Sequence, residues 1–71
     1  MLVKELKELM ANCDLNILIG KRNGIHLHSG WNVEKELYSG WGNNIPNELH
    51  DMVVLGFDND EEQIYVYVKG I

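Results

Sequence analysis

The sequence has 71 residues, of which 45% are hydrophobic and 24% charged, and its formal net charge is −5. This length fits one small domain over residues 1–71, because domains run from about 50 to 250 residues. An acidic surface repels phosphate backbones, which disfavours direct binding to nucleic acid. No apolar run approaches the ~20 residues of a membrane-spanning helix, and the charged first residues lack the apolar segment of a signal peptide. We therefore expect a cytoplasmic protein without a membrane partner.

Apolar residues at the start of the chain recur at helical spacing on one face. They are Val3, Leu6, Leu9, Met10 and Cys13. Lysines and glutamates between positions 4 and 8 occupy the opposite face. This pattern predicts an amphipathic helix of about three turns, which must pack against something because so short a helix is marginal alone.

A first β-hairpin is predicted over residues 15–30. Residues 15–20 read Leu-Asn-Ile-Leu-Ile-Gly, which is β-branched and too short for a helix. Asn23-Gly24 is a strong signal for a two-residue hairpin turn, because both central residues of that turn need positive φ. Residues 25–29 then alternate between two histidines and less polar residues, which is typical of a half-buried strand.

The middle segment, residues 31–51, has the weakest pattern, and we expect it to be largely irregular. Asn32 suits the cap of a short helix over residues 33–38. Residues 40–42 read Gly-Trp-Gly and indicate a loop. Residues 45–49 suit a single helical turn with the proline at its first position.

A second hairpin is predicted from an apolar strand over residues 52–57, a polar turn over residues 58–62 and a strand over residues 63–69. In the last strand three aliphatic residues alternate with two tyrosines. The sequence therefore predicts an α+β domain, in which an N-terminal helix packs on a four-stranded antiparallel sheet made of two β-hairpins.

Residues with catalytic or metal-binding chemistry are few. His26 and His28 share one sheet face, but two ligands do not make a zinc site, and surface histidines are the simpler interpretation. Cys13 with His50 as a base could form a nucleophilic pair, although a cysteine in an apolar stripe is more often a small buried hydrophobe. The acidic turn is short and lacks the central glycine of a calcium loop. We expect no catalytic residue, no metal and no cofactor.

Five of the six aromatic residues lie in the middle segment or on the outer face of the last strand. They are Trp31, Tyr38, Trp41, Tyr65 and Tyr67. Together with the two histidines on an uncovered sheet face, they are candidates for contact with a partner protein. The alternative, of equal weight, is that residues 31–51 fold back over that face and form a second small core.

Several segments together resemble small uncharacterised proteins of phages and prophages in Gram-positive bacteria. The segments are Val3-Lys4-Glu5-Leu6, Leu15-Asn16-Ile17-Leu18-Ile19, Tyr38-Ser39-Gly40, residues 44–49, Val53-Val54 and residues 58–68. In those proteins a short leading helix is followed by a strand, an Ile-Pro-x-x-Leu turn and a closing hairpin. The resemblance implies a phage accessory protein in the host cytoplasm that binds and inhibits or redirects host proteins, as anti-CRISPR and other anti-defence factors do. No residue role carries over.

The leading hypothesis is a non-enzymatic protein binder of this phage type, whose acidic surface meets a basic patch on a host or phage protein. One alternative is a homo-oligomer that binds a small molecule or nucleotide. Another is a structural or assembly protein. A small hydrolase that uses Cys13 or the histidines ranks last. Self-association fits the small core of so short a chain.

Overall fold

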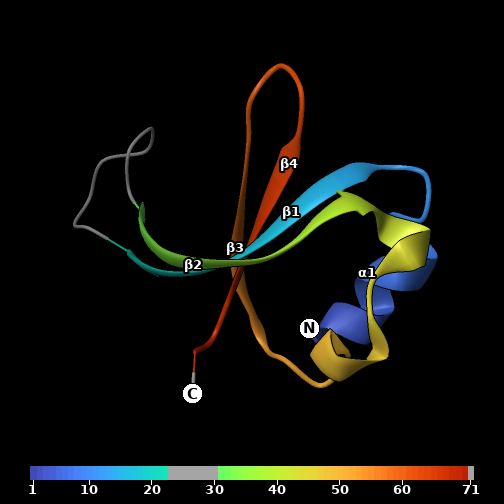
Figure 1. The fold of residues 1–71 in the computed structure, drawn as a ribbon, viewed down its shortest axis with the longest axis horizontal. Helices are drawn as coiled ribbons and strands as arrows, with labels where there is room; N and C mark the ends of the chain where they lie inside the picture. The colour runs from blue at the N-terminus through green and yellow to red at the C-terminus, as the bar shows by residue number, and fades with distance from the viewer. Residues whose placement is uncertain (23–30, 71) are drawn as a thin grey trace.

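The fold was analysed in a computed structural model that describes residues 1–22 and 31–70. The elements are a helix α1 (Val3–Leu9), strands β1 (Asp14–Arg22) and β2 (Trp31–Trp41), 3-10 helices η1 (Gly42–Asn44) and η2 (Asn47–Leu49), and strands β3 (Val54–Asn59) and β4 (Ile64–Val68). Figure 1 shows α1 and both 3-10 helices gathered at one end of β1 and β2, which extend well beyond them.

The four strands form one sheet in the order β2-β1-β4-β3. Two antiparallel hairpins, β1 with β2 and β3 with β4, are joined by parallel pairing of β1 with β4. In that central pairing Leu15 lies beside Ile64 and Ile19 beside Val68. One helix and a four-stranded sheet confirm the α+β class, but the expectation of a purely antiparallel sheet is wrong, because the sheet is mixed.

The mixed sheet follows from the connection between the hairpins. β2 ends beside the start of β1, where Trp41 pairs with Asp14, whereas β3 begins beside the end of β4, where Val54 pairs with Val68. Residues 42–53 must therefore travel the length of the sheet. β2 and β3, which this connection joins, run in the same direction. Consecutive strands of that kind need a crossover, whereas a tight turn suffices for antiparallel neighbours. The patterns of the two hairpins say nothing about this connection.

β2 is the largest departure from the sequence prediction. The short helix expected over residues 33–38 is wrong, and Gly40 and Trp41 belong to the strand rather than to a loop. The pairing of β2 with β1 shifts register after Ile17 and again after Ile19. Each shift breaks the two-residue alternation, so the strand has no clear period in the sequence. The strand and turn predicted within residues 23–30 lie outside the described residues.

The second hairpin is confirmed as β3 and β4, and the single helical turn is confirmed as η2, which Pro46 precedes as its N-terminal cap. The leading helix is also present, but it is shorter than predicted. It ends at Leu9, whose side chain is 70% exposed although the apolar stripe places it in the core. Cys13 lies beyond the helix and packs, half-buried, against the core.

The core lies between α1, the crossover connection and one face of the sheet. Its buried side chains come from all three: Val3 and Leu6 from the helix, Ile45 from the connection, and Leu15, Ile17, Val66 and Val68 from β1 and β4. The alternation of Ile64, Val66 and Val68 with two tyrosines therefore identified the core face of β4. Because α1 has only seven residues, it covers only part of this face.

Candidate binding groove

The predicted partner-binding aromatics do not gather on one surface in the part of the chain that is described. Tyr38 pairs with Ile17 and packs against the core. Tyr65 and Tyr67 lie on the other face of the sheet, because they alternate with the buried Val66. Trp41 is 55% exposed at the end of β2, and the side chain of Trp31 is outside the described structure.

The three tyrosines have local structural roles. The Tyr38 hydroxyl donates a hydrogen bond to the carbonyl oxygen of Trp41 over 2.7 Å. The Tyr65 hydroxyl donates to the Asp60 carboxylate, and this bond raises the pKa of Tyr65 above its ordinary value of 10.0. Tyr67 is only 6% exposed, and its burial, followed by the nearby Asp58 carboxylate, raises its pKa.

The alternative in which residues 31–51 fold back over the tyrosine face is wrong. Residues 31–41 form an edge strand of the sheet, and Ile45 from the following connection is buried with α1 in the core on the opposite face. The middle segment therefore completes the first core instead of building a second one.

The residues weighed for catalysis or metal binding also separate, as far as they are described. Cys13 packs against the core, while the His50 ring lies beside Lys7, with 3.5 Å between His50 Nε2 and Lys7 Nζ. His26 and His28 lie outside the described residues. Across residues 1–22 and 31–70 no group of three or more histidine, cysteine or acidic residues is placed to hold a metal ion.

A groove of about 680 Å³ lies on the core side of the sheet, beyond the part that α1 covers. Its lining comes from β1, β2, the crossover connection and the end of β4. The lining residues are Ile19, Lys35, Leu37, Glu48, Leu49, Asp51, Met52, Val53, Lys69 and Gly70. We refer to these ten residues as the groove.

The floor of the groove is apolar. Ile19 of β1 and Leu37 of β2 belong to the core side of the sheet, and Leu49 and Met52 of the connection face them. All four are half-buried and pack against the core cluster. The groove is thus a part of the hydrophobic core that remains open to solvent because the helix is short.

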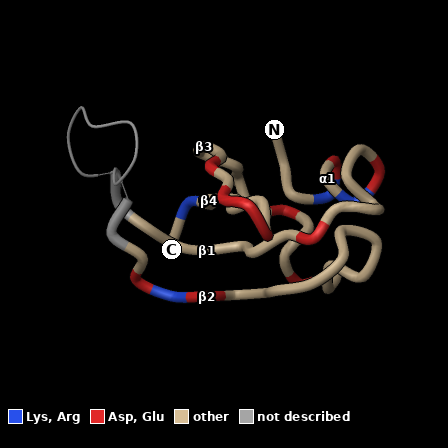
Figure 2. Tube along the Cα trace, turned by 90° about the horizontal axis from the view of Figure 1, so that it is seen from above, with Lys and Arg blue, Asp and Glu red and all other residues tan. Residues whose placement is uncertain are grey.

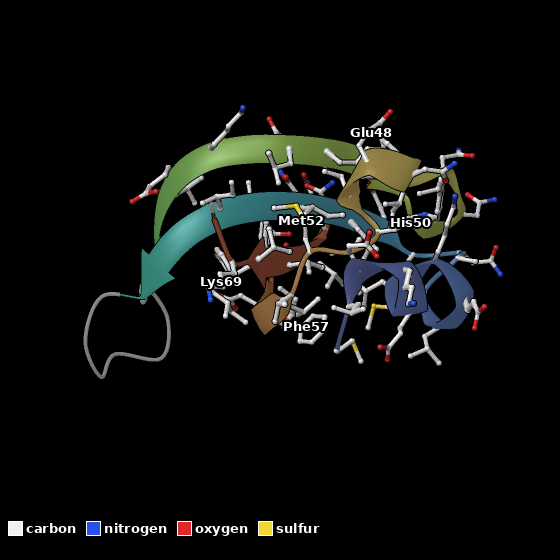
Figure 3. All side chains as sticks on the ribbon, turned by 90° about the horizontal axis from the view of Figure 1, so that it is seen from below. Glu48, His50, Met52, Phe57 and Lys69 are labelled. Carbon is white, nitrogen blue, oxygen red and sulfur yellow. The ribbon has the colours of Figure 1, made fainter. Side chains whose placement is uncertain are left out.

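The charged residues of the groove divide by sign between the elements that carry them. Lys35 is the β2 neighbour of Ile19, and Lys69 directly follows Val68, which is the β4 neighbour of Ile19. Glu48 and Asp51 both belong to the connection. In Figure 3 Met52 lies between Glu48 and Lys69. The lysines of the groove therefore come from β2 and the end of the β4 chain, and its acidic residues come from the connection, around an apolar centre.

The sequence prediction missed the groove because it did not recognise β2 as a strand. Leu37 and Lys35 reach the groove only because that strand pairs with β1. The adjacent apolar residues Leu37 and Tyr38 were the available sign of this strand. Both pack against the core, and two successive residues on one face are what a β-bulge produces in a strand.

Comparison with known proteins finds no match for this chain among family models, curated proteins or solved structures. None of the helices in the described residues is both long enough and apolar enough to cross a membrane.

Proposed function

We propose that this chain is a non-enzymatic binding protein that accommodates an apolar side chain of a partner protein in its groove. The observation that carries the proposal is the combination of a half-buried apolar floor with exposed lysines from the sheet and exposed acidic residues from the connection around it. Protein-binding sites commonly join an apolar centre to a polar rim in this way. Burying one leucine- or phenylalanine-sized side chain contributes about 1.5–3 kcal/mol, so neighbouring polar contacts must add to the affinity.

The charged rim defines what the partner segment should look like. An acidic residue next to the inserted apolar residue would face Lys35 or Lys69, and a basic residue next to it would face Glu48 or Asp51. Figure 2 shows the lysine positions on β2 and beside β4 as blue segments of the chain. All four of these side chains are exposed.

The overall charge of the chain adds a long-range preference. A net charge of −5 attracts partners whose surface is basic, and such attraction increases association rates more than it increases affinity. Binding should therefore be faster at low salt. The role as a phage accessory protein belongs to the same proposal and rests on the resemblance of the sequence motifs. In that role the partner is a host or phage protein, and binding inhibits it, for example in a host defence system.

A small aliphatic molecule is the second candidate ligand. The groove volume of about 680 Å³ falls in the range of about 300–1,000 Å³ that is typical of small-molecule sites. None of the ten groove residues is aromatic, so stacking on a nucleotide base has no platform there.

The proposal can be tested by selecting peptides from a random display library with the purified chain. We expect selected peptides to share one large apolar residue with an acidic and a basic flank. The variant Leu37→Lys should weaken their binding at least tenfold, because it places a charge on the apolar floor. Val33→Lys is the matched control, since Val33 is an exposed residue of the same strand outside the groove.

Leu37 also packs against the core, so the folding of Leu37→Lys must be checked by circular dichroism. The double variant Lys35→Glu/Lys69→Glu changes only exposed side chains and should also weaken peptides that have an acidic flank. The proposal fails if no peptide is selected, or if the selected peptides bind the groove variants and the wild-type chain equally well.

A further inference from the structure

The outer edge of β3 is open and apolar. β3 is the last strand of the sheet, and β4 pairs with one side of it. On the other side only its start has a partner: the Val54 N–H donates to the Met1 carbonyl oxygen over 2.9 Å, and Leu2 forms a bridge with Val53. Past Val54, residues 55–59 have no strand beside them on that side within the described structure.

Apolar side chains accompany this open edge. Leu55 is 52% exposed and Phe57 is 45% exposed, and Met1 and Val53 at the start of the strand are exposed as well. Natural proteins usually protect an edge strand with charged residues, proline, a β-bulge or a covering segment. Residues 53–59 read Val-Val-Leu-Gly-Phe-Asp-Asn; Asp58 is their one charged residue, and the register shift of β3 lies between Val54 and Gly56. Past that shift, the exposed apolar edge around Phe57 is open to pairing with another chain.

The charges at the two ends of β3 indicate the direction of that pairing. Its far end leads into the acidic turn that contains Asp60, Glu61 and Glu62. Its start lies beside Lys69, whose N–H donates to the Val53 carbonyl oxygen over 2.9 Å. If an identical strand pairs in the antiparallel direction, each acidic turn comes next to the lysine end of the other copy.

We propose that a second copy of this chain pairs with β3 in the antiparallel direction, so that two four-stranded sheets join into one sheet of eight strands. Residues 1–3 occupy the space beside the start of β3, so the shared stretch is residues 55–59 with Phe57 at its centre. A two-fold axis at that point brings the two Phe57 side chains together and uses the same surface on both copies. A stretch of this length forms a small interface, so the dimer is weak and depends on concentration.

Sedimentation velocity of the full chain over a series of concentrations tests this inference. We expect a monomer–dimer equilibrium in the wild-type chain. Phe57→Lys and Leu55→Lys should each raise the dissociation constant at least tenfold, because each places a charge within the shared stretch. Val33→Lys makes the same change at an exposed position on the opposite edge strand and should leave the equilibrium unchanged.

A separate variant tests how much the attraction between Lys69 and the acidic turn contributes to the dimer. Lys69→Glu should weaken the dimer severalfold, because it replaces attraction to the second acidic turn with repulsion. A chain that is monomeric at every concentration overturns the inference, and so does a dimer that both β3 variants leave intact. Loss of the dimer in Val33→Lys alone would assign the contact to β2 and overturn it as well. Peptide binding by the groove is measured separately, so either proposal can fail without the other.

Discussion

Gly42 packs so closely against Met10 that a Cβ atom on Gly42 would lie 2.0 Å from the Met10 carbonyl oxygen. The same two segments are joined by backbone hydrogen bonds, from the Gly42 N–H to the Cys13 carbonyl over 2.9 Å and from the Asn43 N–H to the Ala11 carbonyl over 3.1 Å. The chain that leaves α1 and the chain that leaves β2 are therefore held backbone to backbone. This contact places the crossover connection over the core.

Gly42→Ala should destabilise the fold strongly, because the added methyl group meets backbone rather than a flexible side chain. We expect the free energy of unfolding to fall by about 1–3 kcal/mol, the usual cost of overpacking a tight site. Urea denaturation followed by circular dichroism measures it. Asn43→Ala is the control, since Asn43 is exposed and bonds through its backbone; equal midpoints for the two variants would contradict the close contact.

Leu6→Ala and Leu9→Ala separate the core from the apolar stripe of the sequence. Leu6 is fully buried, so its truncation should cost about 2–5 kcal/mol in the free energy of unfolding. Leu9 is mostly exposed, so the same change there should cost less than about 0.5 kcal/mol. Thermal and urea denaturation of both variants measure the difference. Similar losses at the two positions would mean that the helix packs along its whole length.

Gln63→Leu should loosen the start of β4. The Gln63 side-chain nitrogen donates to Asp14 Oδ1 over 3.0 Å and to Ser39 Oγ over 2.9 Å, and it lies 3.2 Å from the Leu15 carbonyl oxygen. One amide thus joins β4 to both β1 and β2. We expect a loss of about 1–2 kcal/mol in the free energy of unfolding. Glu61→Leu, at an exposed position in the same turn, should have a much smaller effect.

Asp60 should make the stability of the second hairpin depend on pH. The Tyr65 hydroxyl, followed by the N–H groups of Glu62 and Gln63, holds the pKa of Asp60 below its ordinary value of 3.8. A lowered pKa stabilises the fold above pH 3.8, and that contribution is lost as the pH falls through the folded-state pKa. Comparing thermal midpoints of the wild-type chain and Asp60→Asn at neutral and acidic pH checks this. The variant should be less stable at neutral pH, and the difference should shrink in acid.

Tyr65 should make the stability of the fold depend on pH in the alkaline range. Its pKa is raised by the same hydrogen bond, so the neutral hydroxyl stabilises the fold below its ordinary pKa of 10.0. This contribution disappears as the pH rises through the higher folded-state value. Tyr65→Phe should remove the stability that this hydrogen bond adds at neutral pH. It should also remove the decrease in stability that ionisation of Tyr65 causes at alkaline pH. A variant with the same pH profile as the wild-type chain would show that the hydrogen bond contributes nothing.

The success of the sequence prediction differed between the hairpins for a physical reason. β4 alternates residue by residue between the core face and the tyrosine face, so Val66 and Val68 were identifiable from the sequence. β2 shifts register twice against β1, and an edge strand has only one neighbour to constrain it. Its residues therefore match no single period. The groove depends on β2, so it was missed together with that strand.

By itself the sequence determined two elements whose side chains repeat at a fixed spacing, the amphipathic helix and the second hairpin, and one helical turn that Pro46 indicates. The two repeating patterns arise because each of those elements has to bury one face. Only the tertiary structure decided how the elements are joined. The parallel pairing of β1 with β4, the burial of Ile45 and the groove beside Ile19 all follow from the path of residues 42–53 across the sheet. That path depends on contacts between residues far apart in the chain, such as Gly42 with Met10, and such contacts leave no period in the sequence.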